Sequence, residues 1–126
     1  MAGFLGTNAR IEEVYANADL LVHPAIYEPF SNACLEAVAC GLPVVSSRIN
    51  GASEVIVAGK NGAVVKDPGD IASLAAAIEP FLDPKIYAAA SIVARQTAES
   101  LPFNRNVEET LEVIRKLKLE LTAAVG

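Results

Sequence analysis

The sequence predicts an α/β protein in which a parallel, doubly wound sheet carries helices on both faces. Short apolar runs alternate along the chain with stretches of helical spacing, and continuous apolar runs are typical of strands buried on both faces. The composition agrees, because 52% of the 126 residues are apolar, only 6% are aromatic and none is Trp. A core of small and β-branched side chains lets helices lie close on such a sheet, and a chain of this length forms one domain at most.

The expected elements follow one another without a linker, an internal repeat or a low-complexity segment. The strands are a stub at 4–6 and three apolar runs at 19–24, 43–47 and 63–65. Helical patterns occupy the remaining segments: 10–17, 31–40, 52–58, 71–82, 84–100 and 106–123. In the first of them, Ile11, Val14 and Tyr15 share one face. We therefore expect a single unit with a parallel α/β core at about 3–82 and C-terminal helices at about 84–123.

The helix boundaries are predicted from residues that favour the ends of helices. Ser31 is a natural N-cap and Gly41 a natural C′ residue for the helix between them. The turn at 67–70 ends in Asp70, which we expect to cap the next helix. Asp83 and the proline after it open another helix, and a proline at position 102 separates that helix from the last one.

Charge and hydropathy exclude two classes of partner. The net charge of −5 argues against nucleic acid, because phosphate neutralisation needs clustered Lys and Arg. Arg115, Lys116 and Lys118 form the one basic group, and their spacing among Leu and Glu favours the solvated face of a helix over a lipid or phosphate patch. No apolar run approaches the length that spans a membrane, and nothing at the N-terminus resembles a signal peptide.

The two cysteines indicate a reducing compartment. Cys34 and Cys40 lie six residues apart in a predicted helix, and six residues turn a helix by about 600°, so the thiols point to different faces. We expect neither a disulfide nor a shared metal site, and we expect buried thiols in a cytoplasmic protein.

The residues that indicate chemistry lie between the first long strand and the helix after it. The strand ends near His23, a loop carries Glu28, and the helix that begins near Ser31 carries Glu36 between one and two turns in. Ligands of open α/β sheets bind at the carboxyl ends of strands, and the free N–H groups at a helix start suit a phosphate. Two carboxylates at this spacing can both line a cleft there, and carboxylates accept paired hydrogen bonds from the vicinal diols of a sugar or a ribose.

The same residues also allow ordinary structural roles. The two glutamates could be one charge that favours the helix dipole and one solvated side chain. His23 ends a strand on the binding side and could touch a ligand, but a lone histidine is often a structural residue. Tyr27 could line the pocket, although packing is its more common role.

The whole segment from Tyr27 to Val45 resembles a signature of the group 1 (family 4) retaining glycosyltransferases. In that family a strand ends in Pro, a Glu follows, and a glycine-containing turn opens a helix that reads Leu-Glu-Ala-hydrophobic-Ala-Cys-Gly-Leu-Pro-Val. Glu28 and Glu36 match the two glutamates of its E-x7-E motif. Three further segments resemble later motifs of the family in the same order: 51–56, 59–62 and 67–70. The resemblance runs from Phe4 to about Leu82 and more loosely to the end.

The resemblance implies a fold and a set of donor-binding residues. The fold would be Rossmann-like, as part of the C-terminal domain of a two-domain GT-B glycosyltransferase. Glu28 would hold hydroxyls of the donor sugar and Glu36 the ribose hydroxyls, while backbone amides at Phe30, Ser31 and Asn32 would face the sugar and diphosphate. Pro29 and Ser31 stand where the family usually has glycines, and proline removes one N–H donor. The donor would be a nucleotide-diphospho-sugar; most members of the family bind no metal, and we expect no metal and no cofactor here.

The resemblance also identifies parts of the family's structure that this sequence does not contain. Relatives carry two further strand–helix units, whose Arg and Lys clamp the diphosphate, and a separate acceptor-binding domain. Arg48 and Lys60 do not occupy the clamp positions, and we expect both on the surface. We therefore assign no catalytic residue in this sequence. We also expect no sugar transfer by the chain alone, because the negative charge that develops on the leaving diphosphate would lack stabilisation.

Other functions remain open at this point. The chain could be a stand-alone module that binds a nucleotide or a sugar, a truncated interaction domain without catalysis, or a relative with the same two-domain fold, such as a nucleotide-sugar epimerase. We also expect a homodimer. In the resembled strand order 3-2-1-4-5-6, the stub at 4–6 and the strand at 20–22 are separated by a gap that would expose unpaired backbone and apolar surface.

Overall fold

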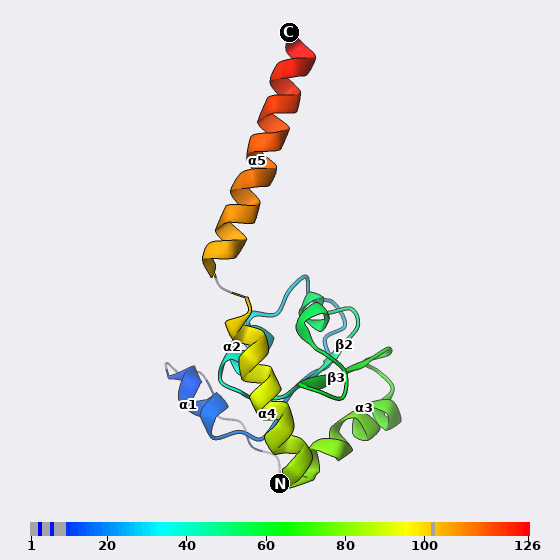
Figure 1. Cartoon of the computed structure of the whole chain (residues 1–126). Helices are drawn as coiled ribbons and strands as arrows, with labels where there is room; N and C mark the ends of the chain where they lie inside the picture. The colour runs from blue at the N-terminus through cyan, green and yellow to red at the C-terminus, as the bar shows by residue number, and fades with distance from the viewer. Residues whose placement is uncertain (1–2, 4–5, 7–9, 102) are drawn as a thin grey trace.

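The structure, a computed structural model, describes residues 3, 6, 10–101 and 103–126. It consists of an α/β body and a long C-terminal helix that projects away from it (Figure 1). The body contains the parallel sheet and every helix up to Glu99.

The sheet has three parallel strands in the order β1-β2-β3. They are β1 (Leu21–His23), β2 (Val44–Ser47) and β3 (Gly62–Val65). The register pairs Leu21 with Val44, and Val44 with Gly62. All three long strands are therefore confirmed, and they are parallel as predicted. The stub at 4–6 depends on Phe4 and Leu5, which lie outside the described residues.

Helices cover both faces of this sheet, as predicted. Successive strand residues point to opposite faces, so Val44 joins one apolar cluster and Val45 the other. The Val44 cluster includes residues of α1 (Ile11–Ala16) and α2 (Asn32–Ala39), and the Val45 cluster packs against α3 (Ile71–Ile78) and the 3-10 helix η2 (Glu79–Leu82). Helix α4 (Pro84–Glu99) contributes to both clusters.

The predicted caps are present. Ser31 is the N-cap of α2, and its Oγ accepts a hydrogen bond from the Cys34 amide at 3.3 Å. Gly41 follows α2 with a φ of 75°, a left-handed conformation that glycine adopts without steric cost. Asp70 and Asp83 cap α3 and α4 through their carboxylates.

Three helix predictions differ from the structure. The segment 52–58 contains only a short 3-10 helix, η1 (Gly51–Val55), because the Asn61 Oδ1 accepts a hydrogen bond from the Val57 amide at 2.7 Å and so ends the helical pattern. Helix α3 ends at Ile78 and continues as η2, since Pro80 lacks the N–H that an α-helix needs. The last helix, α5 (Phe103–Val125), begins three residues before the predicted start.

The two cysteines have different environments. Cys34 is buried and Cys40 is exposed, and neither forms a disulfide. The different faces of the helix were predicted correctly, whereas the prediction that both thiols are buried is wrong for Cys40. Among the described residues, no helix combines the length and the apolar character that crossing a bilayer requires.

Candidate functional site

The candidate site begins where β1 ends and continues to the start of α2. β1 stops at His23, and an irregular loop leads from Pro24 to Ser31. Helix α2 then begins at Asn32. Its first N–H groups have no acceptor within the helix, and the Ser31 cap supplies an acceptor to one of them, the Cys34 amide. The carboxyl end of a parallel strand and the N-terminus of a helix therefore meet at this point, as the sequence predicted.

The loop that carries Glu28 is fixed by backbone contacts. Glu28 forms a parallel bridge with Asn50, and its carbonyl accepts a hydrogen bond from the Gly51 amide at 3.0 Å. The two chain segments approach so closely that a Cβ on Gly51 would lie 1.9 Å from the carbonyl oxygen of Pro29. Only glycine fits at position 51, and the position of the Glu28 backbone depends on it.

Asn50 connects this loop to the sheet, and sequence reasoning missed it. Its side chain is fully buried, and its Oδ1 accepts hydrogen bonds from the amides of Ser31, at 3.2 Å, and Ala52, at 3.0 Å. Its Nδ2 donates to the Ser46 Oγ at 3.0 Å. One side chain thereby joins β2, the start of α2 and η1. The available sequence signal was an Asn-Gly pair that begins three residues after a buried strand.

The contacts of Asn50 also favour one tautomer of His23. Backbone amides only donate, so the atom of Asn50 that faces Ser31 and Ala52 must be its oxygen, and its Nδ2 must face His23. That Nδ2 lies 3.0 Å from the Ser46 Oγ, 3.4 Å from the His23 Nδ1 and 3.6 Å from the Cys34 Sγ, an arrangement that favours an Nδ1 without a proton. In the neutral ring, the proton is then on Nε2, which leaves a donor for a ligand. His23 is half-buried, so both the structural and the ligand-facing role predicted for it are compatible with this geometry.

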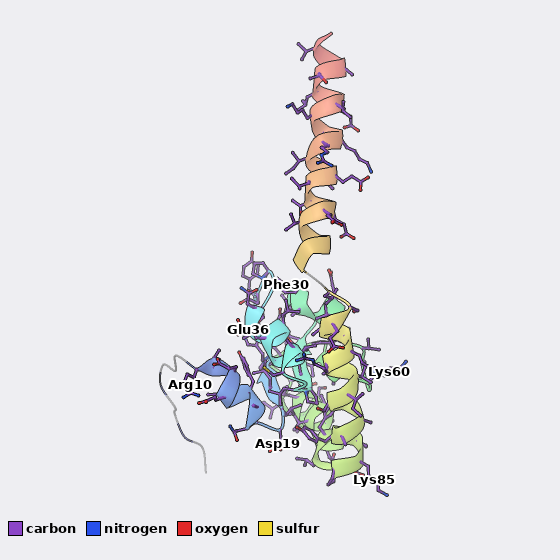
Figure 2. All side chains as sticks on the ribbon, turned by 60° about the vertical axis from the view of Figure 1, so that its left-hand side comes forward. Arg10, Asp19, Phe30, Glu36, Lys60 and Lys85 are labelled. Carbon is purple, nitrogen blue, oxygen red and sulfur yellow. The ribbon has the colours of Figure 1, made fainter. Side chains whose placement is uncertain are left out.

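Glu36 has a partner that the sequence did not identify. The Tyr15 hydroxyl donates a hydrogen bond to the Glu36 Oε2 at 3.3 Å, from α1 across to α2. Burial and the nearby Glu36 carboxylate raise the pKa of Tyr15, so the phenol keeps its proton and remains a donor. The Glu36 side chain is exposed, and Figure 2 shows it on the same side of the body as Phe30.

The remaining predicted residues differ in their exposure. Pro29, Phe30 and Asn32 are exposed on the loop and at the start of α2. Ser31 is buried, and its amide already donates to Asn50, so this amide is not free to face a ligand in the observed conformation. Tyr27 is 81% exposed, so the prediction that it packs into the protein is wrong.

Two cations were predicted to be surface residues. Arg48 and Lys60 are both exposed, as predicted for surface residues. Figure 2 shows Lys60 on the opposite side of the body from Phe30 and Glu36. In the part of the chain that the structure describes, no three His, Cys, Asp or Glu side chains gather as a metal site would require.

Two surface depressions have different chemical character. A hollow of about 240 Å³ lies at the end of β1 and is lined by Val22, His23, Pro24 and Ala25. A larger one, of about 540 Å³, lies over α3 and η2, where Glu79 is its one charged lining residue among Ala, Ile and Leu. Each depression has one polar lining side chain, and the smaller hollow is the better candidate because it lies at the carboxyl end of a parallel strand, where open α/β sheets bind ligands.

Comparisons with known proteins agree with this geometry. The family described as "Glycosyl transferases group 1" matches residues 1–100. The glycogen synthase of Mycobacterium tuberculosis is 47% identical over 66 residues, which cover 52% of this chain and 16% of the synthase. The alpha-maltose-1-phosphate synthase of Mycolicibacterium smegmatis is 33% identical over 115 residues, or 86% of this chain and 30% of that protein. Among solved structures, Anabaena HepE in complex with UDP-glucose is 32% identical with a TM-score of 0.75, over 87% of this chain and 32% of HepE.

The family match covers the body and the candidate site together. The chain spans less than a third of the length of each of these three proteins. Its parallel sheet with helices on both faces is part of the GT-B fold of the similar structures. The chain belongs to the group 1 glycosyltransferases.

Proposed function

We propose that this chain binds the nucleotide-diphospho-sugar donor of a retaining glycosyltransferase. The observation that carries the proposal is the Asn50 network, which holds the end of β1, the Glu28 loop and the start of α2 in one arrangement. Family membership supports it, and so does HepE, whose structure contains UDP-glucose.

Each polar group has a chemical role in this proposal. Glu28 accepts hydrogen bonds from the hydroxyls of the donor sugar, and Glu36 accepts them from the ribose, with Tyr15 orienting its carboxylate. The Asn32 amide and the positive end of α2 interact with the diphosphate, since Ser31 is already engaged. The His23 Nε2 donates to a sugar hydroxyl or a phosphate oxygen. Tyr27 and Phe30 present exposed rings at the mouth of the site.

The whole protein would transfer a hexose to an acceptor hydroxyl with retention of the anomeric configuration. We propose that the isolated chain binds the donor without transferring the sugar. Arg48 and Lys60 do not match the clamp positions of the resembled family, so the leaving diphosphate would lack charge stabilisation. We retain from the resemblance the proposal that donor binding needs no metal and no cofactor. The buried Cys34 thiol is compatible with the cytoplasm, which we propose as the compartment.

Ligand-observed NMR with UDP-glucose tests the proposal directly. We expect a weak, saturable signal that unlabelled UDP displaces. Glu36→Gln should weaken binding by about tenfold, because charge-assisted hydrogen bonds contribute about 1.5–3 kcal/mol and the amide replaces only part of them. Glu79→Gln, an exposed glutamate on the α3 side, is the matched control and should bind as the unmodified chain does.

Three results would count against the proposal. If neither UDP nor UDP-glucose gave a saturable signal at millimolar concentration, the chain would not be a donor-binding unit. Equal loss of binding in Glu36→Gln and Glu79→Gln would place the ligand elsewhere on the surface. Transfer of glucose to an acceptor by the purified chain would contradict the proposed lack of transfer.

A further inference from the structure

The sequence contains two Asn-Gly pairs, at positions 50–51 and 61–62, and the fold depends on both members of each pair. The side chains of Asn50 and Asn61 are fully buried, and each accepts at least one hydrogen bond from a backbone amide. A Cβ on the glycine that follows would lie 1.9 Å from a carbonyl oxygen at position 51 and 2.0 Å from one at position 62. Neither pair can therefore be replaced without disturbing the packing around it.

An Asn-Gly pair is also the dipeptide that deamidates most readily, because glycine has no Cβ to obstruct attack by its own nitrogen on the asparagine side chain. The glycine nitrogen loses its proton and bonds to the asparagine Cγ, the Cγ–Nδ2 bond breaks, and ammonia leaves with that proton. The product is a five-membered succinimide ring. Water then adds to one of the two ring carbonyl carbons and breaks its bond to the ring nitrogen. The result is aspartate or, when the backbone carbonyl is attacked, isoaspartate, which has one extra carbon in the main chain.

The folded conformation opposes this reaction at Asn50. Ring closure requires the Asn50 Cα–C bond to rotate until the Gly51 nitrogen eclipses the Asn50 Cβ, whereas the observed ψ of 124° turns that nitrogen away. The rotation would break the hydrogen bond from the Gly51 amide to the Glu28 carbonyl, which is 3.0 Å long. The carboxamide is also held in place, because its Oδ1 accepts hydrogen bonds from two backbone amides and its Nδ2 donates to the Ser46 Oγ. The reaction therefore requires this loop to open first.

Asn61 is held by more regular structure. Its Oδ1 accepts a hydrogen bond from the Val57 amide at 2.7 Å, and its Nδ2 donates to the Thr97 Oγ1 on α4 at 3.0 Å. Gly62 begins β3, which pairs with β2 along its whole length, whereas Asn50 pairs with the loop before α2 through one isolated bridge. Irregular loops open at a lower free-energy cost than paired strands, so Asn50 becomes exposed more readily than Asn61.

We propose that Asn50 is a latent deamidation site, which the closed loop of the candidate site protects and which reacts when that loop opens. Loops open and close far faster than an amide deamidates, so the rate of modification follows the population of the open form. The modification is irreversible and removes the contacts that prevented it. Isoaspartate lengthens the main chain before Gly51, so the Gly51 amide no longer meets the Glu28 carbonyl. Aspartate replaces the Nδ2 donor with an oxygen that faces the Ser46 Oγ, whose proton already goes to the His23 carbonyl. The inference does not depend on donor binding.

Incubation of the full chain at mildly alkaline pH, with and without denaturing urea, tests the proposal, and Asn61 is the internal control. Peptide mass spectrometry separates asparagine, aspartate and isoaspartate at each pair. In urea we expect similar rates at Asn50 and Asn61, since glycine follows both. In the folded chain both rates should fall, with Asn50 the faster of the two. Equal rates at Asn50 with and without urea would overturn the protection, and so would the absence of any Asn50 product in urea. Faster reaction at Asn61 in the folded chain would contradict the local opening.

A matched pair of variants separates local from global opening. Ser46→Ala removes the acceptor of the Asn50 Nδ2, and Thr97→Val removes the acceptor of the Asn61 Nδ2. Ser46→Ala should accelerate modification of Asn50 in the folded chain about two- to tenfold, the factor that corresponds to one net hydrogen bond. Thr97→Val should leave the Asn50 rate unchanged, because its contact stays closed when the loop opens. Far-UV circular dichroism verifies that both variants are folded. If Thr97→Val accelerated Asn50 as much as Ser46→Ala does, the reaction would pass through global unfolding and the proposal would be wrong.

Discussion

Replacing Asn50 with alanine tests whether one buried side chain holds the candidate site together. The substitution removes the acceptor of the Ser31 and Ala52 amides and the donor to Ser46. Ser31 is 5% exposed and Ala52 is fully buried, so neither amide gains full access to water. Each buried donor left without a partner costs about 1–3 kcal/mol, which gives about 2–6 kcal/mol for the pair.

We expect a loss near the middle of that range, about 3–4 kcal/mol, because water can enter part of the space that the side chain vacates. Domains of this size unfold with about 5–15 kcal/mol, so the variant should remain folded at low temperature but melt much earlier. For a body of about 100 residues, this loss corresponds to a fall in Tm of more than about 12 °C.

Thermal and urea unfolding of matched variants provide the assay. Gln96→Ala is the control, because Gln96 is exposed on α4 and the change should stay within about 0.5 kcal/mol. Ser46→Ala removes the acceptor of the Asn50 Nδ2 and the donor to the His23 carbonyl, but it leaves the Ser31 and Ala52 amides paired, so it should have an intermediate effect. Amide exchange at Ser31 and Ala52 should accelerate in Asn50→Ala. A loss below about 1 kcal/mol, or unchanged exchange at both amides, would refute the assignment of Asn50 as the connector.

Three other predictions follow from the same contacts. Gly51→Ala should destabilise the body and displace the Glu28 loop, because its Cβ would lie 1.9 Å from the Pro29 carbonyl oxygen; unfolding midpoints and chemical shifts of residues 28–31 measure both effects. Burial and the Glu36 carboxylate raise the folded-state pKa of Tyr15 above its ordinary value of 10.0, so the contribution of Tyr15 to stability is complete below pH 10 and is lost as the pH rises through the folded pKa. Tyr15→Phe should remove this part of the loss of stability at alkaline pH, measured by urea unfolding at a series of pH values. An identical pH profile in the variant would contradict the coupling of Tyr15 to burial and Glu36. A thiol reagent should modify Cys40 quickly and Cys34 only on unfolding, and equal rates in the native protein would contradict the burial of Cys34.

Local sequence signals predicted most of the fold. The apolar runs identified all three described strands, and Ser31, Gly41, Asp70 and Asp83 defined helix ends through contacts within a few residues. The errors also have local causes. Pro80 was treated as part of a continuous helix, and the segment after Asn50 was given one α-helical turn too many.

The candidate site was predicted less completely because it depends on contacts between distant segments. Glu28 and Glu36 were identified through a motif, and the structure gives their backbones defined positions at the loop and on α2. Asn50 and Tyr15 were not identified as residues of the site. Asn50 pairs with Ser31, 19 residues away along the chain, and Tyr15 pairs with Glu36, 21 residues away. No periodicity or spacing reports such a pair.

The sequence by itself determined the class of fold, the helix caps and the family, because these depend on patterns of a few residues and on an ordered series of motifs. Only the tertiary structure decided that Asn50 joins three segments and that the Ser31 amide already donates a hydrogen bond to Asn50. It also decided that α5 projects away from the body, with Leu117 and Leu121 exposed. The physical reason is that a hydrogen bond or an uncovered face depends on which elements pack together. Many pairings are compatible with the same local pattern, and only the packing of the chain selects one of them.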